Sequence, residues 1–239
     1  MTHLYILPKK VAYFLGWTVA GLTIGNIAGK TSRYILGHGR LLGLIDLLDV
    51  DREFNLPAFY SSLTLLACSF LLLIIAIAKY QTLDRYTAHW KYLSLIFLYL
   101  SLDEWLSLHE RLIYPLRSKL GGSGPFFFTW VVVGIVFLAV FLVAYVRFTL
   151  NLPQNIRHLF VVAGSTYVAG AIGMEMIGGW YASLYGVQNF TYHIITAGEE
   201  FLEMAGIAIF IYTLLNYLAQ YIRGVHIAFR EIPERPILY

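Results

Sequence analysis

The chain has 239 residues, of which 59% are hydrophobic and only 13% are charged, and its formal net charge is +3. Soluble domains carry roughly a quarter charged residues, so this composition excludes an ordinary water-soluble domain and predicts a membrane protein. The small net charge gives no support for a nucleic-acid partner. The single cysteine, Cys68, excludes an internal disulfide and a cysteine-based zinc or iron–sulfur site.

Apolar stretches of about 20 residues, the length that crosses the hydrocarbon core as a helix, recur along the chain. They predict an all-α membrane protein, a bundle of about six transmembrane helices that forms one domain over residues 1–239. Its surface would contact membrane lipids. The predicted spans are 11–29, 57–80, 90–114, 126–148, 156–181 and 191–222.

The first span follows Lys9 and Lys10, as the apolar part of a signal peptide would. Its length and the lack of a clear small-residue cleavage site favour a retained helix. Gly21, Gly25 and Gly29 recur at four-residue spacing, so we expect another helix to pack closely on this ridge.

The connection between the first two spans is rich in leucine and isoleucine over 41–50, where Asp46 and Asp49 fall on one stripe with Glu53. This pattern predicts a short amphipathic helix in the membrane interface. The segments on the N-terminal side of the membrane carry more Lys and Arg than the others, and 182–192 carries none. The positive-inside rule therefore places both termini in the cytoplasm.

Acidic residues and two histidines fall inside the third, fifth and sixth predicted spans. Ionisable groups at this depth are costly and usually mark function. The candidate site residues are Asp103, Glu104, His109, Glu110, Glu175, His193, Glu199, Glu200 and Glu203. The third and fifth spans carry these residues in their C-terminal halves, and the sixth span, which runs in the opposite direction, carries them in its N-terminal half. All of them are therefore expected at one level of the bilayer, on the outer side.

Helical spacing refines this expectation. Asp103 and Glu110 would share one face of the third helix, and Glu199 and Glu203 one face of the sixth. On this spacing His109 points away from the face of Asp103. Glycines of the fifth span would let its neighbours approach closely. They are Gly170, Gly173, Gly178 and Gly179.

So many carboxylates in a low dielectric cannot all stay ionised, and Arg111 is the only fixed cation expected nearby. Either several acids hold protons or a cation lies among them. Carboxylates with one or two imidazoles suit iron, manganese or zinc. The Glu-x-x-His pairs of helical di-metal centres and the paired histidine boxes of membrane desaturases are both missing from the sequence.

Three stretches of the sequence stand out together. They are Asp49-Val-Asp-Arg-Glu-Phe-Asn-Leu-Pro57 with Ser61-Ser62, Asp103-Glu104 with His109-Glu110, and Glu199-Glu200-x-x-Glu203-Met204-x-Gly206. The set resembles a group of uncharacterised bacterial multi-pass membrane proteins over most of the chain from the second span onward. The resemblance implies a bacterial origin, hence the bacterial plasma membrane, and implies no activity.

The first hypothesis is a metal-dependent membrane enzyme or redox protein that acts on a lipid-soluble or outer-side substrate. The second is a cation- or proton-coupled transporter or channel; the inner halves of the acid-bearing spans carry no acids, which argues against a full path. The third is a non-catalytic subunit or assembly factor with a membrane-protein partner. A purely structural set of protonated acids that hydrogen-bonds the helices together is the alternative to all three.

Overall fold

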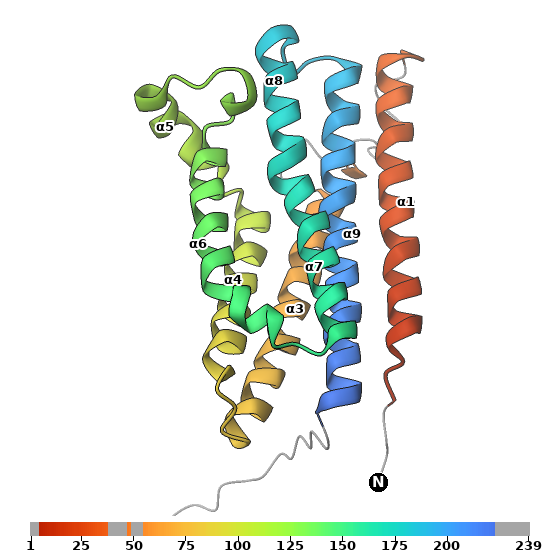
Figure 1. The fold of residues 1–239 in the computed structure, drawn as a ribbon. Coiled ribbons are helices and arrows are strands. Elements are labelled where there is room, and N and C mark those ends of the chain that lie inside the picture. Colours follow the sequence, from red (N-terminus) through yellow and green to blue (C-terminus); the bar gives the residue numbers. More distant parts are fainter. Residues whose placement is uncertain (1–4, 38–46, 49–54, 223–239) are drawn as a thin grey trace, which may run out of the picture.

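The computed structural model describes residues 5–37, 47–48 and 55–222, and all regular structure in these ranges is helical (Figure 1). The α-helices are α1 (Pro8–Tyr34), α3 (Leu56–Gln81), α4 (Thr87–Leu106), α5 (Ile113–Leu120), α6 (Trp130–Leu150), α7 (Gln154–Val168), α8 (Glu175–Tyr185) and α9 (Phe190–Tyr221). Two 3₁₀ turns, η1 (Glu110–Leu112) and η2 (Gly124–Phe126), flank α5, and a π-helical segment, η3 (Ala169–Met174), joins α7 to α8.

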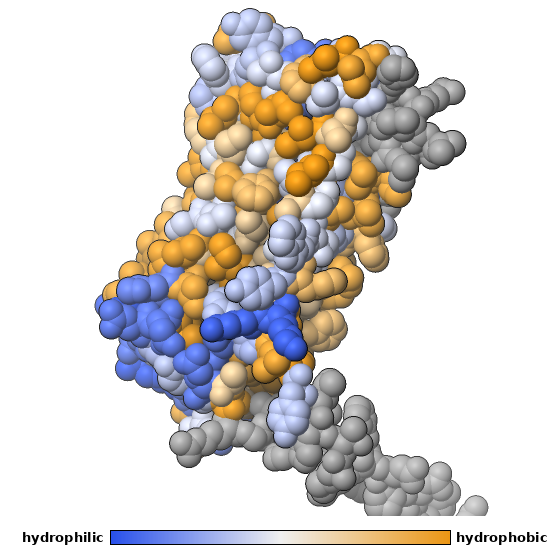
Figure 2. All heavy atoms as spheres, turned by 90° about the vertical axis from the view of Figure 1, so that its right-hand side faces the viewer, coloured by the Kyte–Doolittle hydropathy of each residue, from blue (hydrophilic) through white to orange (hydrophobic). Residues whose placement is uncertain are grey.

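Five helical stretches of the described chain are long and apolar enough to cross a membrane: α1, α3, α6, the continuous α7–η3–α8 and α9. Their outward faces keep large apolar side chains exposed, such as Trp17, Phe70 and Val143. Figure 2, which views the side on which α1 lies, shows apolar residues over much of the bundle and hydrophilic residues gathered near its lower end. The chain is therefore a multi-pass membrane protein.

The third predicted span corresponds to α4, which is 20 residues long. It is not among these five because it carries Lys91, Asp103 and Glu104. A sixth crossing by α4 stays a prediction.

Helix α9 runs through the middle of the bundle and contacts α1, α3, α7 and α8 (Figure 1). It also meets α4 through two ring pairs. Phe97 stacks on Phe210 with the ring centres 4.7 Å apart, and Trp90 lies against Tyr217 at 4.9 Å. Because the residue numbers rise along one helix as they fall along the other, α4 and α9 are antiparallel.

Helices α3 and α4 are joined by two serine pairs. The Ser69 hydroxyl donates to the Ser94 carbonyl at 2.8 Å, and the Ser94 hydroxyl donates back to the Ser69 carbonyl at 2.9 Å. Ser62 and Ser101 repeat this exchange, each donating over 2.8 Å. The pairs recur every seven residues because that spacing returns to the same helix face. Small hydroxylated residues therefore set the close approach of these antiparallel helices.

Glycines bring α7 and η3 against α9. A Cβ at Gly206 would lie 2.7 Å from the backbone nitrogen of Tyr167, and one at Gly170 would lie 2.8 Å from the Glu199 carbonyl oxygen and from Cγ of Glu203. The expected close packing in the fifth span is thus confirmed at Gly170. It also holds for Gly178 and Gly179, and it is wrong for Gly173, which has nothing within 4 Å.

The predicted glycine ridge of the first span has a close neighbour at Gly25 and none at Gly21. A Cβ at Gly25 would meet the side chain of the helical residue Leu48 at 3.0 Å, whereas one at Gly21 would meet nothing within 4 Å. Helix α1 also buries larger residues, Leu22 and Asn26 among them, and it contacts α9. The predicted interfacial helix over 41–50 lies outside the described residues except for 47–48, which are helical.

The two halves of the bundle differ. The lower half, as drawn in Figure 1, includes the α3–α4 turn at Asp84 and the α6–α7 turn at Asn151. Its interior is an apolar cluster that includes Leu72, Ile75 and Leu214, all fully buried. The upper half includes the C-terminal end of α1 and the start of α9, and it holds the acidic residues of α4, η3–α8 and α9.

Candidate functional site

Asp103 and His109 form a pair where α4 ends. The predicted helix to residue 114 is wrong, because Ser107 adopts a left-handed conformation (φ 46°, ψ 47°) and stops the helix at Leu106. The chain then turns back on itself. The backbone N–H of His109 donates to one carboxylate oxygen of Asp103 at 2.9 Å, and Nδ1 of the ring lies 2.7 Å from the other. The expectation that His109 faces away from Asp103 is thus wrong.

A tryptophan links this pair to the next helix. The Trp130 ring of α6 lies 4.6 Å from the ring of His109, and its Nε1–H donates to Oε1 of Glu175 at 2.8 Å. Trp130 therefore fixes Glu175 in place and lies between the imidazole and that carboxylate.

Glu175 begins α8 directly after the π-helical segment. Such segments are rare and are frequent at functional sites. The side chain of Glu175 is within hydrogen-bonding reach of Glu199 on α9. Two carboxyl groups can share a hydrogen bond only when one of them holds a proton. The two carboxyl groups are therefore close neighbours across the α8–α9 contact.

Glu203 lies one turn beyond Glu199, against the bare backbone of Gly170. The antiparallel register of α4 and α9 set by Phe97 and Phe210 brings Glu104 to the same level. The carboxyl groups of Glu104 and Glu203 interact electrostatically with each other and with Glu200. Glu203 is about 20 Å along the axis from the start of α9, so this level is close to the middle of the helix.

These acids have intermediate exposure as whole residues, and one carboxylate oxygen of Glu200 is buried. Glu104, Glu175, Glu199, Glu200 and Glu203 all retain intermediate exposure. Glu110 is exposed at the start of η1 and no longer shares a helix face with Asp103. The expected ladder of Asp103 and Glu110 on one helix is thus wrong, whereas Glu199 and Glu203 do share the uninterrupted helix α9.

His193 belongs to a different contact. Nζ of Lys30 lies 3.2 Å from its Nδ1, and the Tyr34 hydroxyl lies 2.7 Å from its Nε2. Lys30 is 2% exposed, so a buried cation lies in this half of the bundle in addition to the expected Arg111, which is exposed. Sequence reasoning missed Lys30 because it was assigned to the loop after the first span.

Among the residues that the structure describes, no three His, Cys, Asp or Glu side chains are grouped closely enough to hold a metal ion. The acids are instead arranged as hydrogen-bonded or electrostatically interacting neighbours. Asp103 and His109 thus form a hydrogen-bonded pair, Glu175 and Glu199 are electrostatic neighbours, and Glu104, Glu200 and Glu203 lie beside them.

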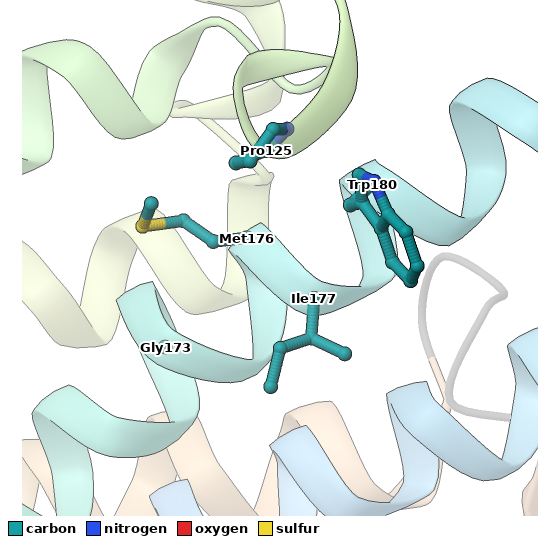
Figure 3. Close-up of a pocket in the computed structure, with 5 residues that line it drawn as sticks. All are labelled: Pro125, Gly173, Met176, Ile177 and Trp180. Carbon is teal, nitrogen blue, oxygen red and sulfur yellow. The ribbon is translucent and has the colours of Figure 1, made fainter.

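An open apolar depression of about 460 Å³ lies beside Glu175 on the outer face of α8. It is lined by Pro125, Gly173, Met176, Ile177 and Trp180. Figure 3 shows Pro125 of η2 facing this stretch of η3 and α8. The missing side chain at Gly173 leaves part of this space open, so an apolar molecule in the lipid could approach the segment that carries Glu175.

Comparison with known proteins places the chain in a family. A model of a domain of unknown function (DUF8692) matches residues 14–218. The chain belongs to this family. No curated protein and no solved structure matches the chain. The matched range includes every candidate site residue named above, so the site lies within the family's domain.

The arrangement supports proton exchange better than hydrolysis. It offers carboxyl groups that can accept or release protons, an imidazole oriented by a carboxylate, and a tryptophan N–H between them. A nucleophilic serine with a histidine base would be a different arrangement: the hydroxyls of Ser62 and Ser101 donate to backbone carbonyls of the neighbouring helix.

Proposed function

We propose that this membrane protein is a proton-coupled transporter whose proton-binding groups are the carboxyls of α4, α8 and α9. The close approach of the carboxyl groups of Glu175 and Glu199 within an apolar bundle carries the proposal. Two ionised carboxylates repel each other, and that repulsion grows as the surroundings become less polar. A proton shared between them removes it, and a site that must hold protons at mid-membrane can also release them.

Neighbouring groups extend this pair. Glu104, Glu200 and Glu203 lie within electrostatic range of one another, so protonation of one changes the free energy of protonating the others. Asp103 and His109 supply a further exchangeable proton at the upper end of α4. Below this level the interior is apolar, so the acids face one side in this conformation. Alternate exposure of the Glu199–Glu203 turn to the two sides would complete the transport cycle.

The orientation that we propose for the protein in the membrane follows from the distribution of Lys and Arg residues. With both termini in the cytoplasm of a bacterial cell, the upper half faces outward. Protons would then reach the acids from the external side.

Proton movement in liposomes tests the proposal. Full-length protein is reconstituted with a trapped pH-sensitive dye, and an ion gradient is imposed across the membrane. We expect wild type to move protons and both Glu199→Gln and Glu203→Gln to abolish the movement. Asp84→Asn, the same chemical change at the lower end, should retain it. Wild type that moves no more protons than empty liposomes would refute transport.

A metal-dependent redox protein or enzyme is the second candidate, and the Asp103–His109 contact favours it. Histidines that bind metals usually bond their other ring nitrogen to a carboxylate, and Asp103 holds Nδ1 in this way. Iron, manganese or zinc would use Nε2 of His109 with nearby carboxylates, and the depression beside Glu175 would admit a lipid-soluble substrate. Elemental analysis of the purified protein tests it: a stoichiometric metal that His109→Ala removes would support this candidate over proton transport.

A further inference from the structure

Asn26 is buried in the bundle without a hydrogen-bond partner among the described residues. Its side chain is 3% exposed, and neither its amide oxygen nor its amide nitrogen is bonded. Ser61 on α3 is 1% exposed, and its hydroxyl is also unpartnered in the described chain. An unmade hydrogen bond at a buried polar group is costly, so such groups usually have a water, ion or ligand beside them.

The register of α1 against α9 directs Asn26 toward Glu200. One helical turn above Asn26, Lys30 bonds His193, and one turn below it Leu22 packs with Met204. The residues of α9 that lie on the same face between His193 and Met204 are Ala197 and Glu200. Asn26 therefore faces this pair, and the alanine leaves room above the carboxyl group.

The register of α3 against α9 directs Ser61 to the same place. Lys79 lies over the ring of Tyr217, with its Nζ 5.7 Å from the ring centre. The two helices run in the same direction, since each is antiparallel to α4. Ser61 precedes Lys79 by about five full turns and so points to the same side, toward α9. The residue of α9 that precedes Tyr217 by the same five turns is Glu199, which is adjacent to Glu200.

The groups that these two registers direct to one region are oxygen donors, one of them ionisable and the others neutral. They are the amide oxygen of Asn26, the hydroxyl of Ser61, the carboxyl of Glu200 and, one turn before Asn26, the unbonded hydroxyl of Thr23. Hard cations prefer such oxygen ligands. One carboxylate with several neutral oxygens balances a single positive charge, and Glu104 and Glu203 lie close enough to feel it.

We propose that Asn26, Ser61 and Glu200 form a binding site for a monovalent hard cation of the Na⁺ class. The inference rests on the proposed transport function in one respect: the cation would be the species exchanged for protons. Binding of Na⁺ would favour the ionised acids, and protonation would favour its release. The cation site itself is inferred from the burial of Asn26 and Ser61 and from the register of α1, α3 and α9.

Thermal unfolding of the detergent-solubilised full chain tests the site. The unfolding temperature is measured against increasing NaCl, with choline chloride keeping the ionic strength constant. We expect Na⁺ to raise it in wild type, since a ligand that binds only the folded state stabilises it. In Asn26→Leu and in Ser61→Ala the half-saturating Na⁺ concentration should rise at least tenfold. Asn216→Leu, a matched change on the lower part of α9, should respond as wild type does.

Two outcomes overturn the site: an unfolding temperature that Na⁺ does not raise above the choline baseline, and an unchanged half-saturating concentration in both variants. The two proposals fail separately. A Na⁺ response without proton movement in liposomes removes the transport function and keeps the cation site. Proton movement that Glu199→Gln abolishes, without any Na⁺ response, removes the site and keeps the function.

Discussion

The upper and lower halves of the bundle use the same helices in opposite ways. In the lower half, α3, α4 and α9 bury leucines, isoleucines and aromatic ring pairs in a core where side chains fill the space between helices. In the upper half the helices approach through glycine, and the space between them holds carboxyl groups. Helix α9 is thus anchored at one end by packing and carries its ionisable groups at the other. The following changes test that division.

The largest effect is expected where glycine sets the helix contact. Gly206→Ala puts a methyl group 2.7 Å from the backbone of Tyr167, and backbone cannot rotate away as a side chain can. Overpacking of this kind costs about 1–3 kcal/mol. The unfolding temperature in detergent should fall by about 5–10 °C. Gly21→Ala, where nothing lies within 4 Å, is the matched control and should leave it unchanged or slightly raised. Equal losses in both variants would contradict the account.

Removing one acid from the upper half should stabilise the protein while it abolishes function. Glu203→Gln keeps the size of the side chain and removes a group that can ionise beside Glu104 and Glu200. We expect a gain of about 0.5–2 kcal/mol, as at other sites where function requires strain. Thermal unfolding at neutral pH measures it. A clear loss of stability would mean that Glu203 serves mainly as a structural hydrogen-bond partner.

The serine pairs should contribute less. Ser69→Ala combined with Ser94→Ala removes two hydrogen bonds between α3 and α4 and keeps the small side chains. Hydrogen bonds between membrane helices average about 0.6 kcal/mol, so the loss should be about 1 kcal/mol. Thr18→Val, whose hydroxyl bonds only its own helix, is the control and should cost almost nothing. A double variant as stable as wild type would show that shape alone holds these helices together.

The smallest effect is expected at the α3–α4 turn, outside the membrane. Partial burial alone would raise the pKa of Asp84, but the N–H of Tyr86 and the ammonium of Lys79, 3.1 Å away, hold that pKa below its usual value. Stabilisation by this carboxylate is therefore present at neutral pH and is lost as the pH falls through the folded-state pKa. Asp84→Asn should lower the unfolding temperature slightly at neutral pH and not in strong acid. A difference that persists in acid would rule out the ion pair as its source.

The sequence predicts the helices of this fold closely where hydropathy is uninterrupted. The sixth span, predicted over 191–222, is α9 at Phe190–Tyr221, and the second, predicted over 57–80, is α3 at Leu56–Gln81. The prediction for the third span is wrong at its C-terminal end, because Ser107 takes a left-handed conformation that apolar periodicity does not signal. Apolar periodicity also does not signal the π-helical segment before Glu175, because one inserted residue leaves the composition of the span unchanged.

The acidic residues of the candidate site could be predicted from the sequence, whereas the residues that contact them could not. Carboxyl groups inside apolar spans are energetically costly, so they can be recognised in any sequence as candidate functional residues. Glu104, Glu199 and Glu203 are predicted in this way. Trp130 and Asn26 are ordinary residues of a membrane helix, and only the packing of α6 on α8 and of α1 on α9 gives them a role. The pairing of His109 with Asp103 depends on the turn that ends α4, which helical geometry could not anticipate.

Infrared spectroscopy of the full chain at neutral pH tests the central claim most directly, because protonated carboxyl groups and carboxylates absorb at different frequencies. We expect a protonated-carboxyl band in wild type that is lost or strongly reduced in Glu199→Gln and is retained in Asp84→Asn. A wild-type spectrum with carboxylate bands alone, or a protonated band that persists unchanged in Glu199→Gln and Glu203→Gln, would contradict it.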